Sequence, residues 1–171
     1  MAIEKVKEYF KQFGMEDKVL EFDVSSATVE LAAAALGCEP QRIAKSITMN
    51  VDGGCVMIVA AGDVKIDNAK YKAEFSTKAK MLSADEALSM TGHAVGGICP
   101  FAINDGCRVY LDESLKRFDF VYPACGSSNS AIKLTIEELE KYALEKGDVI
   151  EAVKSGRQER LETILNEVIF N

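Results

Sequence analysis

The chain has 171 residues, 48% of them hydrophobic and 27% charged, and its net charge is −7. This length predicts one domain with a hydrophobic core. The excess of acidic residues argues against broad, charge-driven nucleic-acid binding, although a local basic patch is compatible with it. Five cysteines without a C-x-x-C pair and a single histidine argue against a disulfide framework or a zinc site and favour a reducing, cytoplasmic compartment. No apolar run is long enough to span a bilayer, and the charged N-terminus is unlike a signal peptide.

The first part of the chain alternates helix and strand signals. Residues 2–13 predict a helix, because their apolar side chains fall on one face and a glycine follows. A short strand is expected over 19–24, an alanine-rich helix over 28–36, and one further helical turn over 40–43. The clearest signal is a hairpin over 46–61, whose apolar strands flank the turn Asp52-Gly53-Gly54.

The second part predicts short helices mixed irregularly with strands. The expected elements are a helix over 68–75, a helix opened by the capping box Ser83-x-x-Glu86, strands over 108–111, 118–122 and 131–134, and a helix opened by Thr135-x-x-Glu138 that ends near residue 144. An amphipathic helix is expected over 156–169, where its apolar stripe packs on its own domain or serves a dimer or partner. This order predicts an α+β fold with a mixed or antiparallel sheet that closes towards a barrel.

One stretch, Thr91–Phe101, combines glycines, the only histidine, a cysteine and a proline. Glycine permits close approach to the main chain and Pro100 stiffens it, so we expect either a tight turn between strands or a shaped loop with spare N–H groups. His93, placed at a strand edge, is either a structural residue or a catalytic base. Cys99 is either a packing residue or a nucleophile.

Lys45 stands where a helical turn gives way to an apolar strand. A lysine that enters a buried strand is unusual unless its ammonium reaches a pocket mouth or an anion; the alternative is a solvated lysine at a strand edge. The chain has no P-loop and no dinucleotide-binding fingerprint, so no nucleotide cofactor is indicated.

Three segments, taken in order, resemble the YbaK/prolyl-tRNA synthetase-associated editing-domain family. They are Ile43-Ala44-Lys45-Ser46-Ile47, the G-x-x-x-P loop from Gly96 to Pro100, and residues 124–134 followed by T-I-E-E-L. The resemblance runs from about Asp23 to Tyr142. It implies an α+β fold around a mixed, barrel-like sheet, as a single editing domain over residues 1–171, with a core at about 19–145 and the helix 156–169 appended.

The resemblance also implies a function. Members of the family hydrolyse amino acids wrongly esterified to tRNA, such as alanine or cysteine on the tRNA for proline, and a chain of this length would act free-standing, in trans. The implied partners are the acceptor end of tRNA and a synthetase that presents it, with no membrane, no metal and no other cofactor. The oligomeric state stays open.

Site residues follow from the same resemblance. The family lysine corresponds to Lys45, and the loop glycine and proline correspond to Gly96 and Pro100. The Ser26–Thr28 segment and the Gly126–Asn129 turn match segments that line the pocket. Some alanine-specific members carry a histidine in the later of these segments, where the nearest candidate here is Asn129. The candidate catalytic residues are Lys45, Gly96 and Gly97, and the candidate substrate-binding residues are Ser26, Thr28, Ser46, Ile98, Cys99, Pro100, Ser128 and Asn129.

These residues give a chemical hypothesis. The Lys45 ammonium would hold the terminal adenosine phosphate or the ester oxygen, and N–H groups around Gly96–Ile98 would stabilise the oxyanion while a bound water attacks. Two alternatives stay open: a non-catalytic module that binds an aminoacyl group or small metabolite, and a hydrolase that uses Cys99 and His93. For RNA contact, the sequence offers the lysines Lys65, Lys70, Lys72, Lys78 and Lys80, which otherwise form an ordinary solvated face.

Overall fold

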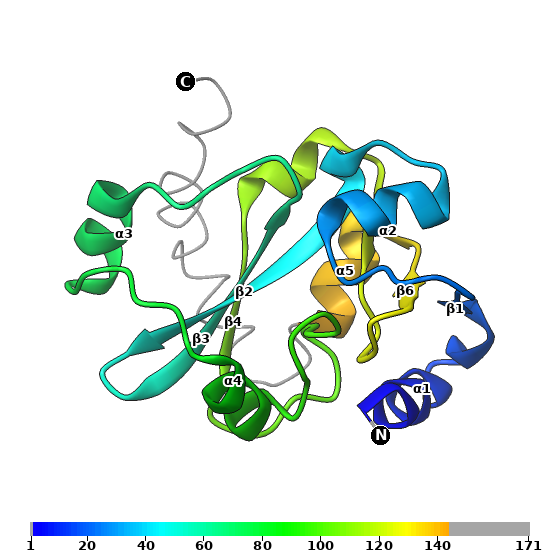
Figure 1. The fold of residues 1–171 in the computed structure, drawn as a ribbon, viewed down its shortest axis with the longest axis horizontal. Coiled ribbons are helices and arrows are strands. Elements are labelled where there is room, and N and C mark those ends of the chain that lie inside the picture. The colour runs from blue at the N-terminus through cyan, green and yellow to red at the C-terminus, as the bar shows by residue number, and fades with distance from the viewer. Residues whose placement is uncertain (1, 144–171) are drawn as a thin grey trace.

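The structure, a computed structural model, describes residues 2–143, so the expected helix 156–169 lies outside the described part. In chain order the elements are α1 (Ala2–Lys11), β1 (Val19–Glu21), α2 (Val29–Leu36), β2 (Ile43–Val51), β3 (Gly54–Ala61), α3 (Asn68–Phe75), α4 (Ala84–Thr91), β4 (Arg108–Leu111), β5 (Phe120–Pro123), β6 (Ser130–Ile132), β7 (Leu134–Thr135) and α5 (Ile136–Ala143) (Figure 1). Short 3₁₀ helices lie at Glu16–Lys18, Pro40–Arg42 and Glu113–Arg117.

The strands form a mixed sheet and a small second sheet. The larger sheet has the order β4-β3-β2-β5-β7, in which β2 pairs antiparallel with β3 and parallel with β5. β4 runs parallel to β3, and β7 runs antiparallel to β5. β1 and β6 form a separate antiparallel pair. This curled, mixed sheet with short helices around it confirms the predicted α+β class.

β3 lies at the centre of the core and is buried on both faces. Met57, Val59 and Ala61 belong to the main hydrophobic cluster, together with residues of α1 and α5. The alternate residues of β3, such as Ile58, belong to a second cluster that includes Tyr71 of α3. A strand covered on both faces reads as a continuous apolar run, which explains the sequence of β3.

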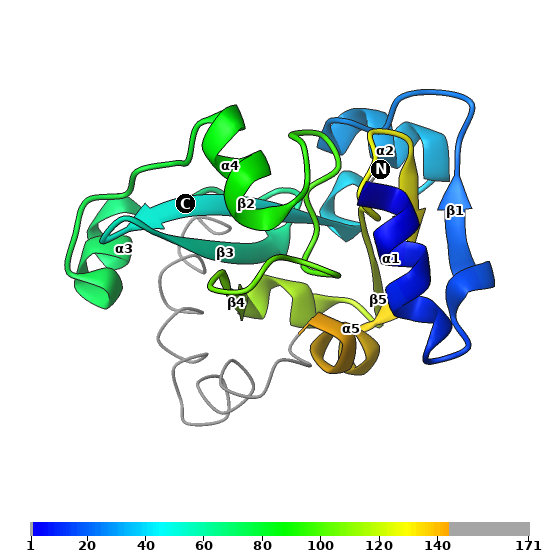
Figure 2. The same ribbon diagram turned by 90° about the horizontal axis from the view of Figure 1, so that it is seen from below.

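Local signals fix the helix ends. The Thr28 side chain accepts a hydrogen bond from Leu31 N at 3.1 Å and so caps α2, and Gly37 closes the same helix with a left-handed φ of 67°. Both predicted capping boxes are present, from Ser83 to Glu86 and from Thr135 to Glu138. α4 and α5 both add buried residues to the cluster that includes Met57 and Val59, so they pack against the same face of β3. α3 and α1 lie towards opposite ends of β2 and β3 (Figure 2).

Several predicted boundaries are wrong. The first helix ends at Lys11 rather than residue 13, and the first strand ends at Glu21 rather than 24. The hairpin begins at Ile43, because Ile43 and Ala44 already pair with β5. The strand predicted over 118–122 is Phe120–Pro123, and the strand predicted over 131–134 is two strands. β6 pairs with β1 and β7 with β5, so the chain passes between sheets at Lys133.

Candidate functional site

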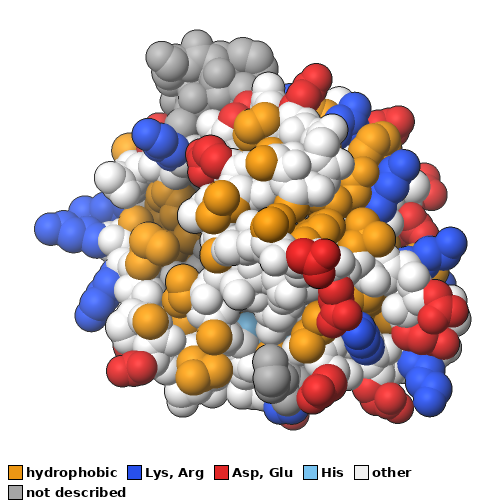
Figure 3. Space-filling model, turned by 45° about the vertical axis from the view of Figure 1, so that its right-hand side comes forward, with side chains coloured by type: hydrophobic (Ala, Val, Ile, Leu, Met, Phe, Trp, Pro, Cys, Tyr) orange, Lys and Arg blue, Asp and Glu red, His pale blue; other side chains and the backbone are white. Residues whose placement is uncertain are grey.

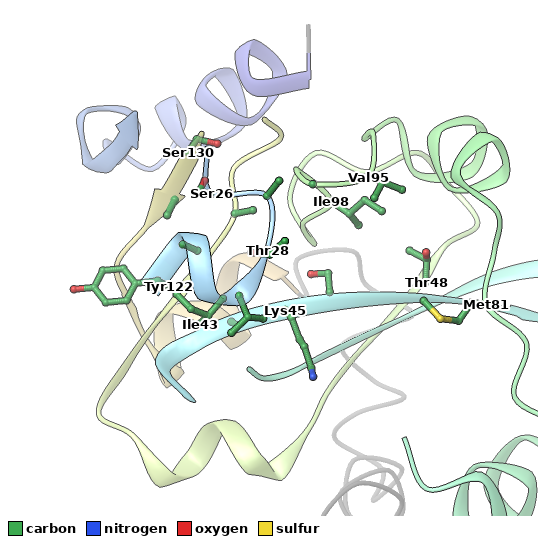
Figure 4. Close-up of a pocket in the computed structure, with 18 of the residues that line it drawn as sticks. Ser26, Thr28, Ile43, Lys45, Thr48, Met81, Val95, Ile98, Tyr122 and Ser130 are labelled. Atoms are coloured by element: carbon green, nitrogen blue, oxygen red, sulfur yellow. The ribbon is translucent and has the colours of Figure 1, made fainter. Parts of the chain in front are cut away.

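A cavity of about 250 Å³ lies between the start of α2, the first half of β2 and the loops on either side of α4 (Figure 4). A volume near the lower end of the range for ligand sites suits a small ligand. Six of the predicted site residues line it: Ser26, Thr28, Lys45, Ser46, Gly96 and Ile98. Lys45 is the one charged residue among those that line it within the described part of the chain.

Two buried hydroxyl groups on the cavity wall have no hydrogen-bond partner among residues 2–143. They are the Oγ atoms of Ser26, whose residue is 8% exposed, and of Ser46. A buried hydroxyl without a partner costs roughly 1–3 kcal/mol in proteins, so such groups are retained where a ligand or water completes them. Both hydroxyls are therefore candidates for ligand contact.

Alternation along β2 decides which side chains face the α4 loops. Because successive side chains of a strand point to opposite faces, Ser46 and Lys45 leave β2 in opposite directions. The Lys45 ammonium points away from Val95 and Ile98 (Figure 4). It donates to the carbonyls of Gly62, at 3.4 Å, and Val64.

Lys45 is thus neither a solvated edge lysine nor a lysine that points at the α4 loops. It is half-buried, and burial lowers its pKa from the usual 10.5, with the neighbouring Asp63 carboxylate acting in the opposite direction. Its ammonium is held by main-chain carbonyls on the far face of β2.

The loop after α4 forms a wall of the cavity through its main chain. Gly96 has a φ of +98°, which favours glycine, and both Gly96 and Ile98 line the cavity. Their N–H groups have no hydrogen-bond partner within the described residues. They are therefore available to a ligand.

Gly97 has a different place in this loop. Its N–H donates to Ala94 O at 3.0 Å, and its carbonyl accepts from Gly126 N at 3.0 Å. A Cβ added at Gly97 would lie 2.6 Å from Ser127 N. Gly97 lets the loop sit directly on the 126–129 turn, and it does not line the cavity.

Cys99, Pro100 and His93 belong to the loop after α4 but are buried and do not line the cavity. Cys99 and His93 are completely buried, with Cys99 Sγ 3.5 Å from His93 Nε2, which is itself 2.8 Å from Phe101 O. Burial raises the pKa of the Cys99 thiol to about 12 and lowers the pKa of His93. His93 lies in a loop, not at a strand edge as predicted. This setting is that of two packed side chains.

The 126–129 turn supports the cavity wall from behind. Ser128 O accepts a hydrogen bond from Ser26 N at 2.6 Å, and Asn129 Nδ2 donates to Phe22 O at 3.0 Å. Ser128 and Asn129 do not themselves line the cavity. Thr48 also lines the cavity and was not predicted, although alternation places it on the same face of β2 as Ser46.

The model of the aminoacyl-tRNA editing domain family matches residues 24–142, which include every residue on the cavity wall. The chain belongs to the aminoacyl-tRNA editing domain family. A second model, the XylA2 C-terminal domain, matches residues 125–169, mostly outside the described part.

Relatives of this editing domain include an uncharacterized protein and proline–tRNA ligases. The uncharacterized protein YwhH of Bacillus subtilis is 50% identical over 147 residues, which cover 85% of this chain and 94% of YwhH. The proline–tRNA ligase of Bacillus licheniformis is 26% identical over 135 residues, which cover 72% of this chain but 23% of the ligase. The editing domain thus matches less than a quarter of that ligase.

Solved structures share the fold of this editing domain. A crystal structure described as a candidate trans-editing enzyme for prolyl-tRNA synthetase has a TM-score of 0.75 and 26% identity, with 83% of this chain and 91% of that chain covered. The structure of protein APE2540 has a TM-score of 0.73 and 27% identity, with 81% and 93% covered. Together with the family match, these likenesses support a deacylase role and a relation to prolyl-tRNA synthetase.

On the face of the editing domain in Figure 3, hydrophobic and uncharged side chains fill most of the middle, and charged side chains stand mainly towards the margin. The predicted RNA-contacting lysines Lys65, Lys72, Lys78 and Lys80 are exposed. None of the helices within residues 2–143 is long and apolar enough to cross a membrane.

Proposed function

We propose that this editing domain hydrolyses the ester bond of mischarged aminoacyl-tRNA in trans, with alanyl or cysteinyl tRNA for proline as substrate. The observation that carries the proposal is a small cavity lined both by two hydroxyls and by main-chain N–H groups that have no hydrogen-bond partner within residues 2–143. An aminoacyl group has an ammonium and a carbonyl oxygen that would complete both kinds of group.

The chemistry follows from this arrangement. The N–H groups of Gly96 and Ile98 would stabilise the oxyanion that forms when water attacks the ester carbonyl, and loss of one such donor typically costs ~10²–10³ in rate. The Ser26 and Ser46 hydroxyls would accept hydrogen bonds from the substrate ammonium, and Thr28 would border the side chain of the esterified amino acid. Gly97 would act as a positioning residue, because it seats the loop on the 126–129 turn.

Lys45 would act on a phosphate rather than on the ester. Its ammonium lies on the far face of β2 from the Gly96 loop, so the terminal phosphate of the tRNA is the group within its reach in our proposal. The carbonyls of Gly62 and Val64 would hold it until substrate arrives. A charge-assisted hydrogen bond of this kind contributes roughly 1.5–3 kcal/mol.

The cavity volume would set the choice of amino acid. One methylene group is worth only about 1–3 kcal/mol of discrimination, so a small cavity excludes large side chains and separates alanine from cysteine weakly. In this proposal the protein acts in the cytoplasm as one domain over residues 1–171, and a synthetase presents the tRNA.

A deacylation panel tests the proposal. Alanyl-, cysteinyl-, seryl- and prolyl-tRNA for proline are incubated with the protein, and the remaining ester is measured over time. We expect hydrolysis of the alanyl or cysteinyl ester, sparing of the prolyl ester, and a large loss of rate in Lys45→Ala. Binding of these tRNAs without turnover would instead favour the non-catalytic module.

A further inference from the structure

We propose that the outer face of β5 binds the single-stranded 3′ end of tRNA through cations that are held on aromatic rings. The proposal rests on the proposed function, since it concerns how the same cavity receives its substrate. It assigns RNA contact to a surface different from the predicted lysines at 65–80.

The aromatic residues come from the alternation of β5 and the residues before it. Phe118, Phe120 and Tyr122 are half-buried, whereas Val121 and Pro123 between and after them are buried. The rings of Phe120 and Tyr122 are 5.7 Å apart, at 85°. Tyr122 also belongs to the cavity lining and projects outward from it (Figure 4). The aromatic face therefore begins at the cavity edge.

Three cations lie over these rings, and we call them the cation row: Arg42, Arg117 and Lys133. Arg42 is 4.2 Å from the centroid of Phe120 and 5.2 Å from that of Phe118. Lys133 is 4.1 Å from the Phe120 centroid, and Arg117 is 4.8 Å from the Phe118 centroid. Such contacts fix flexible cationic side chains in place, which lowers the entropy lost on binding a phosphate.

Two members of the row can turn to a phosphate. Arg42 donates to Asp119 at 3.0 Å and to the carbonyl of Phe120 at 3.1 Å; the Asp119 side chain is 78% exposed, and exposed ion pairs are weak, so a phosphate can replace that carboxylate. Lys133 has no carboxylate partner within the described residues. Arg117 is bound by both Asp63 oxygens, at 2.6 and 3.0 Å, and so serves to fix the end of the row.

The row leads to the Lys45 ammonium. Asp63, the partner of Arg117, lies between the two residues whose carbonyls hold Lys45, and it interacts electrostatically with that ammonium. Arg42 also lies near these residues, because the chain just before it packs tightly against Gly62. A Cβ added at Gly62 would lie 2.2 Å from Pro40 O. The orientation of the Lys45 ammonium, which points away from Val95 and Ile98, is explained if phosphates pass along this side.

A single-stranded nucleic acid suits this surface. Proteins that bind single strands combine cations that follow the backbone with aromatic or guanidinium planes on which bases stack. The cation row supplies the cations that follow the backbone, and the Tyr122 ring at the cavity edge supplies a plane on which a base stacks. A strand whose last base stacks there would direct its 3′ ester into the cavity.

The test compares Arg42→Gln/Lys133→Gln with the matched control Lys72→Gln/Lys78→Gln, which removes the same charge from the other predicted surface. Two substrates are used: mischarged tRNA, and the same amino acid esterified to adenosine, which lacks phosphates. We expect the first variant to lose about tenfold or more in kcat/KM on tRNA and none on the adenosine ester. Its salt slope should fall by about 1.4, at roughly 0.7 per contact to a single strand. The control should match the wild type.

Uncharged tRNA separates this proposal from the proposed function. If the wild type hydrolyses neither ester, the function fails, but the salt slope of tRNA binding still tests the row. An unchanged salt slope of tRNA binding in Arg42→Gln/Lys133→Gln overturns the proposal that the cation row contacts tRNA. A salt slope that is lowered by the Lys72→Gln/Lys78→Gln control instead also overturns it. A loss that occurs only with a synthetase present overturns it too and assigns the face to that protein. If Arg42→Gln disturbs folding, Lys133→Gln alone, at an exposed site, should lower the slope by about 0.7.

Discussion

Replacing either unpartnered serine by alanine should stabilise the protein and impair its activity. In Ser46→Ala, a buried hydroxyl that has no partner within the described residues is removed, and the methyl group that remains fits the same space. The structure thus loses a desolvation penalty of roughly 1–3 kcal/mol and no hydrogen bond. Allowing for water that enters an open cavity, we expect the free energy of unfolding to rise by about 1 kcal/mol, or Tm by about 2–4 °C. Ser26→Ala should behave alike.

Activity should move in the opposite direction. If the hydroxyl accepts from the substrate ammonium, its removal costs about 1.5–3 kcal/mol of binding in the transition state, which lowers kcat/KM by about ten- to a hundredfold. The two effects share one cause, because the group that is unsatisfied in the empty cavity is satisfied by the substrate.

Ser114→Ala is the matched control for the stability measurement. Ser114 is also buried, but its Oγ accepts a hydrogen bond from Ala61 N at 3.1 Å. The same chemical change there leaves a buried N–H without its partner and should lower the free energy of unfolding by about 1–3 kcal/mol. Urea titration gives the stabilities, and initial rates of deacylation give kcat/KM. If Ser46→Ala destabilises the protein as much as Ser114→Ala does, or leaves kcat/KM unchanged, the reasoning is refuted.

Three further predictions concern the loop after α4. Gly97→Ala should lower the free energy of unfolding by about 1–3 kcal/mol in urea titration, because its Cβ meets the main chain of Ser127, whereas Gly54→Ala, with ordinary contacts, should be nearly neutral. Burial lowers the pKa of His93 below 6.5, so in acid the unfolded chain binds a proton that the native chain does not. As the pH decreases from about 6.5, the free energy of unfolding should therefore decrease by at most about 1.4 kcal/mol per pH unit. An NMR titration in which the His93 ring has an ordinary pKa contradicts this. Cys99→Ser should keep nearly full deacylation, since a buried thiol with a pKa of about 12 supplies no thiolate; an inactive but folded variant would restore the Cys99–His93 hydrolase.

Features that depend on neighbouring residues were predictable from the sequence. The hairpin at Asp52-Gly53-Gly54, the capping boxes and the strand Arg108–Leu111 all follow from turn chemistry or short-range pattern, and the structure contains each of them. Strand pairings between distant segments could not be predicted, because no local pattern shows that β2 runs parallel to β5 or that β6 and β7 belong to different sheets.

The candidate site divides in the same way. The sequence placed Ser46 and Gly96 near each other through an ordered set of motifs, and the structure brings both to one cavity. The sequence did not show on which face of β2 the Lys45 ammonium lies, since that depends on where the carbonyls of Gly62 and Val64 come to rest. Nor did it show the cation row, whose members come from residues 42, 117 and 133 and meet only in the folded chain.

The division of residues 130–135 between two sheets limits where this chain can change length. A single inserted residue between β6 and β7 would turn every side chain of one strand to its opposite face and would carry Ser130 and Ala131 away from the cavity. The exposed turn at Asp52 and Gly53, by contrast, can lengthen without moving either strand. Homologous chains should therefore gain and lose residues at the hairpin tip, and keep the spacing from Ser130 to Thr135 constant.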